Sequence, residues 1–296
     1  MEHAHSEALV SPMRWFCFAL LALAASVQAR EVAFPPAWTA PTEPFAIFDD
    51  VYWVGTRGLG AFLFTSPEGH ILVDVGMPQS VGDVVASIER LGFSVQDVRY
   101  LLNTQAHFDH SGGLAEFKAL SGAEMLASAG DRYALEAGVY EGWESRPYFD
   151  FPALQVDRVI EDGDEVRVGD VVLTAMLTPG HSPGCTSWAF EARDGDARHS
   201  ALLFCSASVA ANRLAPNPQY PGIVDDFRAT FRRMALLEVD AWLAPHAEQF
   251  DLDAKRARLG TSPHPFVDPE EKARRMAVFE ADFARALAAQ TGATED

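Results

Sequence analysis

Short apolar runs separated by turn-forming residues recur along most of the chain, which is typical of strands rather than long helices. Strands are predicted near residues 45–54, 60–65, 70–75, 98–103, 156–160, 165–168, 171–177, 185–191, 200–205 and 241–245. Helices are predicted near residues 80–91, 131–137, 224–237 and 269–289. Strands precede a helix in each half of the chain. This order predicts an α/β fold with two stacked sheets between helices, an αββα sandwich.

One loop carries three strong metal-ligand side chains within four positions. Residues 105–110 are Gln-Ala-His-Phe-Asp-His, between the strand at 98–103 and a helix expected to be capped by Ser111 and to run to about Leu120. On such a loop successive side chains can point toward two different metal ions, and imidazole and carboxylate suit zinc. A chance cluster in a solvated loop is the alternative interpretation.

Two further histidines follow predicted strands. His181 stands between two Pro-Gly pairs, which present its imidazole at a strand end, and His246 ends an apolar segment. Each histidine alone would be interpreted as a loop residue. Together with His110, they predict one metal centre at one edge of the sandwich. Three other histidines match no ligand position and are expected at the surface: His70, His199 and His264.

The chain resembles the metallo-β-lactamase superfamily, and within it the third subclass of class B β-lactamases. The family carries His-x-His-x-Asp-His where this chain has Gln-x-His-x-Asp-His, and a minority of the subclass shares the Gln. Four other segments support the resemblance: Ile-Leu-Val-Asp-Val-Gly at 71–76, Asp-Gly-Asp at 162–164, Pro-Gly-His-Ser-Pro-Gly-Cys-Thr-Ser-Trp at 179–188 and Asn-Pro-Gln-Tyr-Pro at 217–221.

The resemblance implies up to two zinc ions per chain. The first would be held by Gln105, His107 and His181, and the second by Asp109, His110 and His246. Because an amide oxygen is a weaker zinc ligand than imidazole, we expect the second site to fill first and a single zinc to be able to support activity.

The resemblance also implies a substrate site. Ser206 and Ser208 would form hydrogen bonds near the metals and to a substrate carboxylate, and Asn212 falls near the oxyanion position; loop capping is the alternative for all three. A further three side chains would line a substrate groove or pack in the core: Trp143, Tyr148 and Phe149.

The reaction implied is hydrolysis of the β-lactam amide bond, which would confer resistance to β-lactam antibiotics. Zinc lowers the pKa of bound water to about 7, and the resulting hydroxide attacks the carbonyl while Asp109 orients it. A lactonase or thioester hydrolase of the same fold is the main alternative. Those families usually place a bridging Asp where this chain has Ser206, which favours the lactamase. An inactive zinc-binding relative is the third hypothesis, permitted by Gln105 but disfavoured by the intact second ligand set.

The start of the chain predicts export. An apolar run follows Arg14 and leads into Ser-Val-Gln-Ala at 26–29, which indicates a signal peptide over residues 1–29, with Met13 as a candidate true start. Residues 30–296 are expected to form one metallo-β-lactamase domain, a monomer in the periplasm or secreted, without membrane attachment after signal removal. The formal net charge of −19 argues against nucleic acid partners.

Two cysteines flank a predicted hairpin. In a simple register Cys185 and Cys205 face each other across adjacent strands, where disulfide geometry is awkward. A disulfide is possible in an oxidising compartment, but we expect buried free thiols. Cys205 is also a minor zinc-ligand candidate, since a one-residue shift in alignment would place it where other lactamase subclasses have a Cys ligand.

Overall fold

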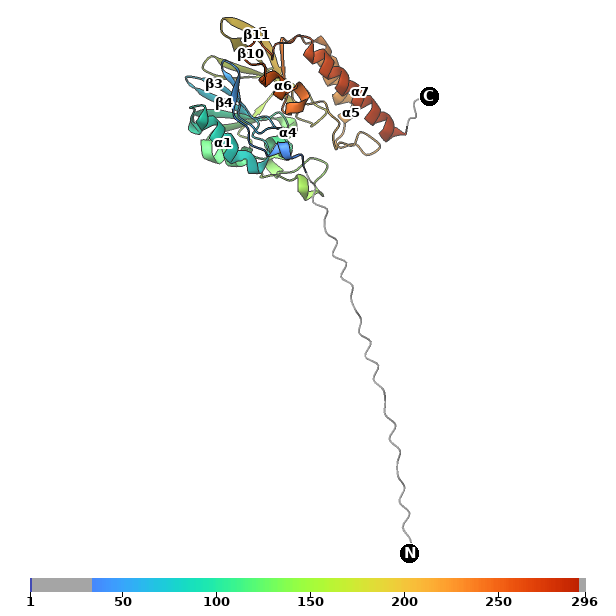
Figure 1. The fold of residues 1–296 in the computed structure, drawn as a ribbon. Helices are drawn as coiled ribbons and strands as arrows, with labels where there is room; N and C mark the ends of the chain where they lie inside the picture. Colours follow the sequence, from blue (N-terminus) through green and yellow to red (C-terminus); the bar gives the residue numbers. More distant parts are fainter. Residues whose placement is uncertain (2–33, 293–296) are drawn as a thin grey trace. The chain divides into compact units, whose positions relative to one another are not determined.

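Two β-sheets form the centre of the fold, and helices cover the outer face of each (Figure 1). The computed structural model describes Met1 and residues 34–292, so the predicted signal peptide lies, apart from Met1, outside the described residues. The predicted αββα sandwich is confirmed.

Within residues 34–292 the first sheet has seven strands in chain order: β1 (Phe45–Phe48), β2 (Val51–Trp53), β3 (Phe62–Ser66), β4 (Gly69–Val73), β5 (Val98–Leu102), β6 (Glu124–Ser128) and β7 (Arg158–Ile160). The second sheet has the order β12-β11-β10-β9-β8: β8 (Glu165–Val168), β9 (Val171–Leu177), β10 (Thr186–Asp194), β11 (Ala197–Leu203) and β12 (Ala241–Leu243). The α-helices are α1 (Val81–Arg90), α2 (Phe108–Ser111), α3 (Leu114–Ser121), α4 (Ala129–Ala137), α5 (Ile223–Leu236), α6 (Leu252–Arg256) and α7 (Glu271–Thr291). Short 3-10 helices lie at η1 (Pro36–Trp38), η2 (Pro78–Ser80), η3 (Val95–Asp97), η4 (Pro147–Phe149) and η5 (Ala247–Phe250).

Strand β3 shows how the sequence builds two cores at once. Phe62 and Phe64 belong to the core between the sheets, whereas Leu63 belongs to the core that α1 closes with Ile88. Phe64 packs edge-on against Phe190 of the second sheet, with ring centroids 4.9 Å apart. Since successive side chains of a strand point to opposite faces, a fully apolar strand is buried on both sides.

Three local expectations are corrected. Ser111 does not cap the helix that follows it; it lies in α2 and its hydroxyl donates to the Gln105 carbonyl at 2.8 Å, while Gly113 is the N-cap of α3. Strand β6 is not predicted, because its residues favour helices and only pairing between β5 and β7 makes it extended. His70 is buried rather than at the surface, with its ring 4.9 Å from that of Phe93.

The strand directions bring the ligand-bearing loops together. Strand β10 is antiparallel to both β9 and β11, and β11 is parallel to β12, so β9, β11 and β12 run in the same direction. Their carboxyl ends lead to His181, Ser206 and His246, and the carboxyl end of β5 leads to the loop at 105–110. Clustering of sites at the carboxyl ends of strands is common in α/β folds. Among the described residues no helix is both long and apolar enough to cross a membrane.

Candidate metal centre

Asp74 fixes the loop that carries the ligands. It follows β4 with a φ of 60°, and its carboxylate accepts hydrogen bonds from the backbone N–H and the hydroxyl of Thr104, each at 2.7 Å. The amides of Val75 and Gly76 donate to the His110 carbonyl at 3.0 and 3.1 Å. The loop after β4 therefore holds both ends of the 105–110 segment.

Asp109, His110 and His246 place three ligand atoms around one point. The Nε2 atoms of the two histidines are 3.1 Å apart, and Asp109 Oδ2 lies 3.4 Å from Nε2 of His110 and 3.5 Å from Nε2 of His246. Zinc bonds of about 2.0–2.1 Å give a tetrahedron with edges of about 3.3 Å. The three atoms are thus spaced as one face of a zinc coordination tetrahedron, which fits the implied metal.

A carboxylate lies near the Nδ1 atom of each imidazole in this group. Nδ1 of His110 lies 3.6 Å from Asp74 Oδ2, and Nδ1 of His246 lies 3.5 Å from Glu248 Oε1. A carboxylate on the far ring nitrogen orients a histidine ligand and favours the tautomer that leaves Nε2 free for the metal.

Gln105, His107 and His181 form an adjoining group. It is the first ligand group of the predicted centre, and the group just described is the second. The His107 and His181 rings are 4.7 Å apart at an angle of 70°. Nδ1 of His181 donates to the Ser208 carbonyl at 2.6 Å, which leaves its Nε2 free to bind a metal. Gln105 is fully buried, and neither atom of its amide has a hydrogen-bond partner among the described residues. Since an unpaired buried amide costs about 1–3 kcal/mol, this side chain fits a ligand role.

Burial and charge set the protonation of the ligands. Burial lowers the pKa of His107 well below its ordinary value, and lowers those of His181 and His246 to about 4 and about 3. These imidazoles are therefore neutral near pH 7, the form that binds metals. Burial alone would lower the pKa of His110 and raise that of Asp109, but the attraction between the two groups reverses both shifts: the pKa of His110 is raised to about 10, and that of Asp109 falls well below its ordinary value. Zinc bound at Nε2 of His110 would displace the imidazole proton and leave Asp109 ionised.

The two cysteines form a disulfide, which corrects the expectation of free thiols. In the β10–β11 register Thr186 would face Cys205, so Cys185 stands one position off and both cysteines lie just beyond the paired residues. The geometric objection to a disulfide within a ladder does not apply there. Because Cys205 is bonded to Cys185, it is not free to act as a zinc ligand.

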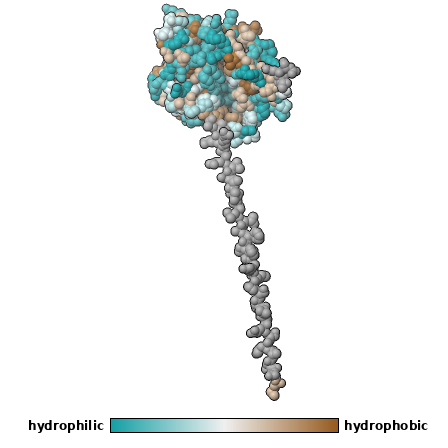
Figure 2. Space-filling model, turned by 45° about the vertical axis from the view of Figure 1, so that its right-hand side comes forward, coloured by the Kyte–Doolittle hydropathy of each residue, from teal (hydrophilic) through white to brown (hydrophobic). Residues whose placement is uncertain are grey.

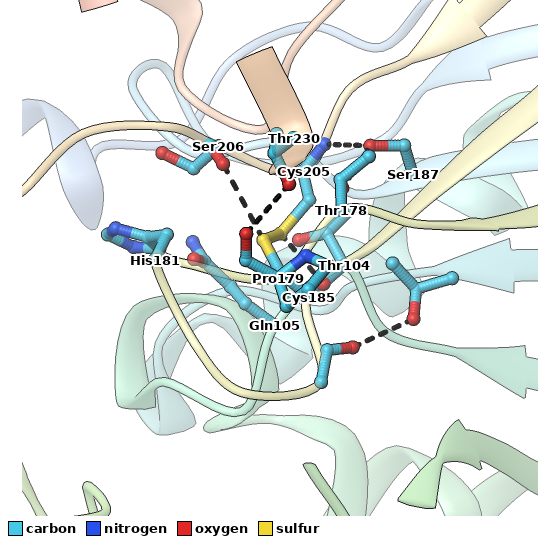
Figure 3. The surroundings of a disulfide bond; sticks show 12 residues. Thr104, Gln105, Thr178, Pro179, His181, Cys185, Ser187, Cys205, Ser206 and Thr230 are labelled. Atoms are coloured by element: carbon cyan, nitrogen blue, oxygen red, sulfur yellow. Dashed lines mark hydrogen bonds between the residues drawn. A yellow bond between two sulfur atoms is a disulfide. The ribbon is translucent and has the colours of Figure 1, made fainter. Parts of the chain in front are cut away.

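The disulfide lies beside the first ligand group. In Figure 3 the disulfide lies between Gln105 and His181 on one side and Ser187 on the other. Cys205 Sγ is 2.9 Å from the Thr104 carbonyl oxygen, and Cys185 Sγ is 3.7 Å from that of Ser206. The bond thus joins the loops after β9 and β11 and contacts the loop after β5.

The predicted substrate residues lie beside the His181 loop. Ser206 is buried and donates from its hydroxyl to that of Ser208 at 3.2 Å, while the half-buried Ser208 hydroxyl lies 3.2 Å from Nδ1 of His181. Asn212 is buried, with its amide between Tyr140 and the His181 backbone.

Aromatic side chains border the centre. Phe149 stacks on Phe108 with centroids 5.5 Å apart, and Tyr148 is exposed. Trp38 lies 5.4 Å from the His246 ring. The segment at 143–149 therefore borders the site at the surface, rather than lying inside the main core.

Three residues of the site were not found from the sequence. Asp74 belongs to the 71–76 segment that supports the family resemblance, and an Asp at the end of a buried strand is itself a signal for a site residue. Asp131 of α4 accepts hydrogen bonds from Asn103 Nδ2 at 3.0 Å and the Gly184 amide at 2.9 Å. Tyr140 follows α4 and gives no sequence signal at all.

The αββα sandwich, with histidines and an aspartate converging at its strand ends, defines a metal-dependent hydrolase fold. The model of the Metallo-beta-lactamase superfamily matches residues 61–246, and the chain belongs to this superfamily.

Solved structures refine this placement. The chain is 46% identical to BJP-1, a subclass B3 metallo-beta-lactamase of Bradyrhizobium japonicum, over 88% of this chain and 99% of that one, with a TM-score of 0.85. It is 32% identical to the FEZ-1 metallo-beta-lactamase of Legionella gormanii, over 87% and 99% of the two chains, with a TM-score of 0.83. The predicted resemblance to the third lactamase subclass is confirmed.

A curated relative covers less of the chain. The hydroxyacylglutathione hydrolase of Rhodospirillum rubrum is 30% identical over 128 residues, which are 43% of this chain and 39% of that protein. The chain thus spans less than half the length of this relative.

Proposed function

We propose that the chain is a zinc-dependent β-lactamase that opens the β-lactam amide bond and so confers antibiotic resistance. One observation carries the proposal: Asp109, His110 and His246 present ligand atoms 3.1–3.5 Å apart in a chain 46% identical to a B3 metallo-beta-lactamase over nearly all of that protein. We further propose that residues 1–29 are a signal peptide and that residues 30–296 form a single-domain monomer that is periplasmic or secreted.

Up to two zinc ions would be held here. Gln105, His107 and His181 would bind one, and Asp109, His110 and His246 the other. When bound, zinc supplies an acidified water and a Lewis acid for the substrate carbonyl.

The protein's own side chains would bind the substrate and orient the nucleophile. Because the Asp109 carboxyl stays ionised, the carboxylate oxygen that is not a metal ligand can accept a hydrogen bond from the attacking nucleophile and direct it. The half-buried Ser208 hydroxyl, supported by Ser206, would donate to a substrate carboxylate. Trp38 and Phe149 offer apolar surface to the body of the substrate and reduce the access of water.

One assay tests the proposal. The purified mature protein, residues 30–296, is offered a carbapenem, a cephalosporin, a lactone and a glutathione thioester, with added zinc and with a chelator. We expect zinc-dependent turnover of at least one β-lactam. Turnover of the lactone or the thioester alone would refute the β-lactamase proposal, and turnover of none would support an inactive zinc-binding relative.

The thioester hydrolase is the second candidate, because a hydroxyacylglutathione hydrolase is among the relatives. The β-lactamase is favoured over it for two reasons. The match to BJP-1 covers 88% of this chain, against 43% for the hydroxyacylglutathione hydrolase. In addition, Ser206 stands where the alternative families usually have a bridging Asp.

A further inference from the structure

Asn212 is turned into the protein rather than toward a substrate. Its side chain is only 3% exposed. Its Oδ1 accepts a hydrogen bond from the Tyr140 hydroxyl at 3.0 Å, and its Nδ2 donates to the His181 carbonyl at 2.8 Å. Both polar atoms of its side-chain amide are therefore already bonded to protein groups.

Tyr140 connects the same amide to the other imidazole of the first group. Its ring is 5% exposed and stacks on His107, with centroids 3.9 Å apart and the planes 13° from parallel. The hydroxyl of this ring is the group that donates to Asn212. Tyr140 and Asn212 therefore form one continuous contact path from His107 to His181.

Residues outside the site fix the backbone of Asn212. The Gln290 side chain of α7 donates to the Asn212 carbonyl at 3.3 Å and accepts from the Leu214 amide at 2.6 Å, and the Asn212 amide donates to the Val209 carbonyl at 2.9 Å. The backbone of Asn212 is thus fixed by the C-terminal helix and its own loop. Its side chain can transmit that rigidity to His181.

We propose that Tyr140 and Asn212 are positioning residues for the metal bound by Gln105, His107 and His181. This inference rests on the proposed zinc-binding function. Gln105 offers that metal only a neutral amide, so the affinity of the group depends on how well the two imidazoles are held in place. Groups that orient metal ligands typically change metal affinity by about 10- to 100-fold.

The second ligand group has no part in this path. The Nδ1 atoms of His110 and His246 instead face Asp74 and Glu248, at 3.6 and 3.5 Å. Loss of the Tyr140–Asn212 contact should therefore weaken one metal site and leave the other as an internal control.

The test is a zinc titration of the mature protein, followed by native mass spectrometry. His181→Ala and His246→Ala, which each remove one ligand group, assign the two binding steps. Tyr140→Phe keeps the stacked ring and removes only the hydroxyl, and Asn212→Ala removes both hydrogen bonds. Matched controls are Tyr133→Phe on the exposed face of α4 and Asn217→Ala in the exposed part of the loop after Asn212.

We expect Tyr140→Phe to weaken the first site about 10-fold and Asn212→Ala at least as much, with the second site and both controls unchanged. Cobalt substitution should show a shifted visible absorption band for the first site only. Unchanged first-site affinity in folded Tyr140→Phe protein, or an equal loss at both sites, would overturn the positioning role. The titration measures binding rather than turnover, so it can fail while the β-lactamase proposal stands, and the reverse.

Discussion

The two ligand groups of the metal centre are built in different ways. Asp109, His110 and His246 already lie at ligand spacing and include an ionised carboxylate. Gln105, His107 and His181 contain no charged ligand, and Gln105 has no partner among the described residues. The ligand positions of the second group follow largely from its own three side chains, whereas those of the first group depend on contacts with surrounding residues.

The location of the ligands on the secondary-structure elements explains this difference. Asp109 and His110 are neighbours on α2, so one helical turn places two of the three ligands. Each group takes its third ligand, His181 or His246, from the second sheet. In the first group the other two ligands precede α2, and His107 and His181 are fixed by contacts with surrounding residues, namely the Ser208 carbonyl, Tyr140 and Asn212. Substitutions can therefore separate the two groups.

The largest expected effect comes from removing charge from the second group. Asp109→Asn keeps the shape of the side chain and should lower kcat/KM by about 10²- to 10³-fold, the loss typical of a group that stabilises charge during reaction. Gln105→Ala should cost less than about 10-fold. Steady-state kinetics at saturating zinc measure both, and equal losses would remove the distinction between the groups.

Loss of the disulfide should lower the stability of the protein and the zinc affinity of the first group. A Cys185→Ser, Cys205→Ser double variant should lower the free energy of unfolding by about 3 kcal/mol, because a loop of this length is no longer closed. Zinc affinity should fall at the first site and not at the second. Urea unfolding and zinc titration measure the two effects, and the wild type treated with reductant should behave like the double variant.

Asp131, which is hydrogen-bonded to loops around the first group, should make the free energy of unfolding depend on pH. Burial raises the pKa of its carboxyl to about 6. The unfolded chain loses this proton near pH 4 and the folded chain keeps it until about pH 6, so the contribution of Asp131 to stability falls as the pH rises through that window. Relative to the non-titrating Asp131→Asn variant, the wild type should lose about 2–3 kcal/mol between pH 4 and 7. A difference that is constant with pH would contradict this assignment.

Gln105→His should give the smallest change. An imidazole in place of the amide should strengthen zinc binding at the first site by about 10-fold, roughly 1.4 kcal/mol, without changing the second. The exposed Gln96→His variant controls for adding a histidine at the surface. Unchanged affinity at the first site would mean that Gln105 is not a ligand.

The sequence predicts the sandwich and the candidate ligands for a physical reason. Strand periodicity determines which side chains face the cores, and ligand spacing within 105–110 follows from local geometry. His181 and His246 could be added because each ends an apolar strand. These features depend on near neighbours in the chain.

The features that the sequence does not predict depend on distant contacts. Strand β6 exists through its pairing with two other strands, and the disulfide forms because both cysteines lie beyond the paired residues. Tyr140 meets His107 only in the folded protein, 33 positions further along the chain. The inward direction of Asn212 likewise depends on Tyr140 and Gln290.

We expect the two ligand groups to bind zinc unequally, the second more tightly than the first. Stepwise zinc titration of the metal-free mature protein, followed by native mass spectrometry, measures this directly. We expect a one-zinc species to accumulate before the two-zinc species, and we expect His246→Ala to abolish the tighter step while His181→Ala leaves it. Two steps of equal affinity, or loss of the tighter step in His181→Ala, would contradict it.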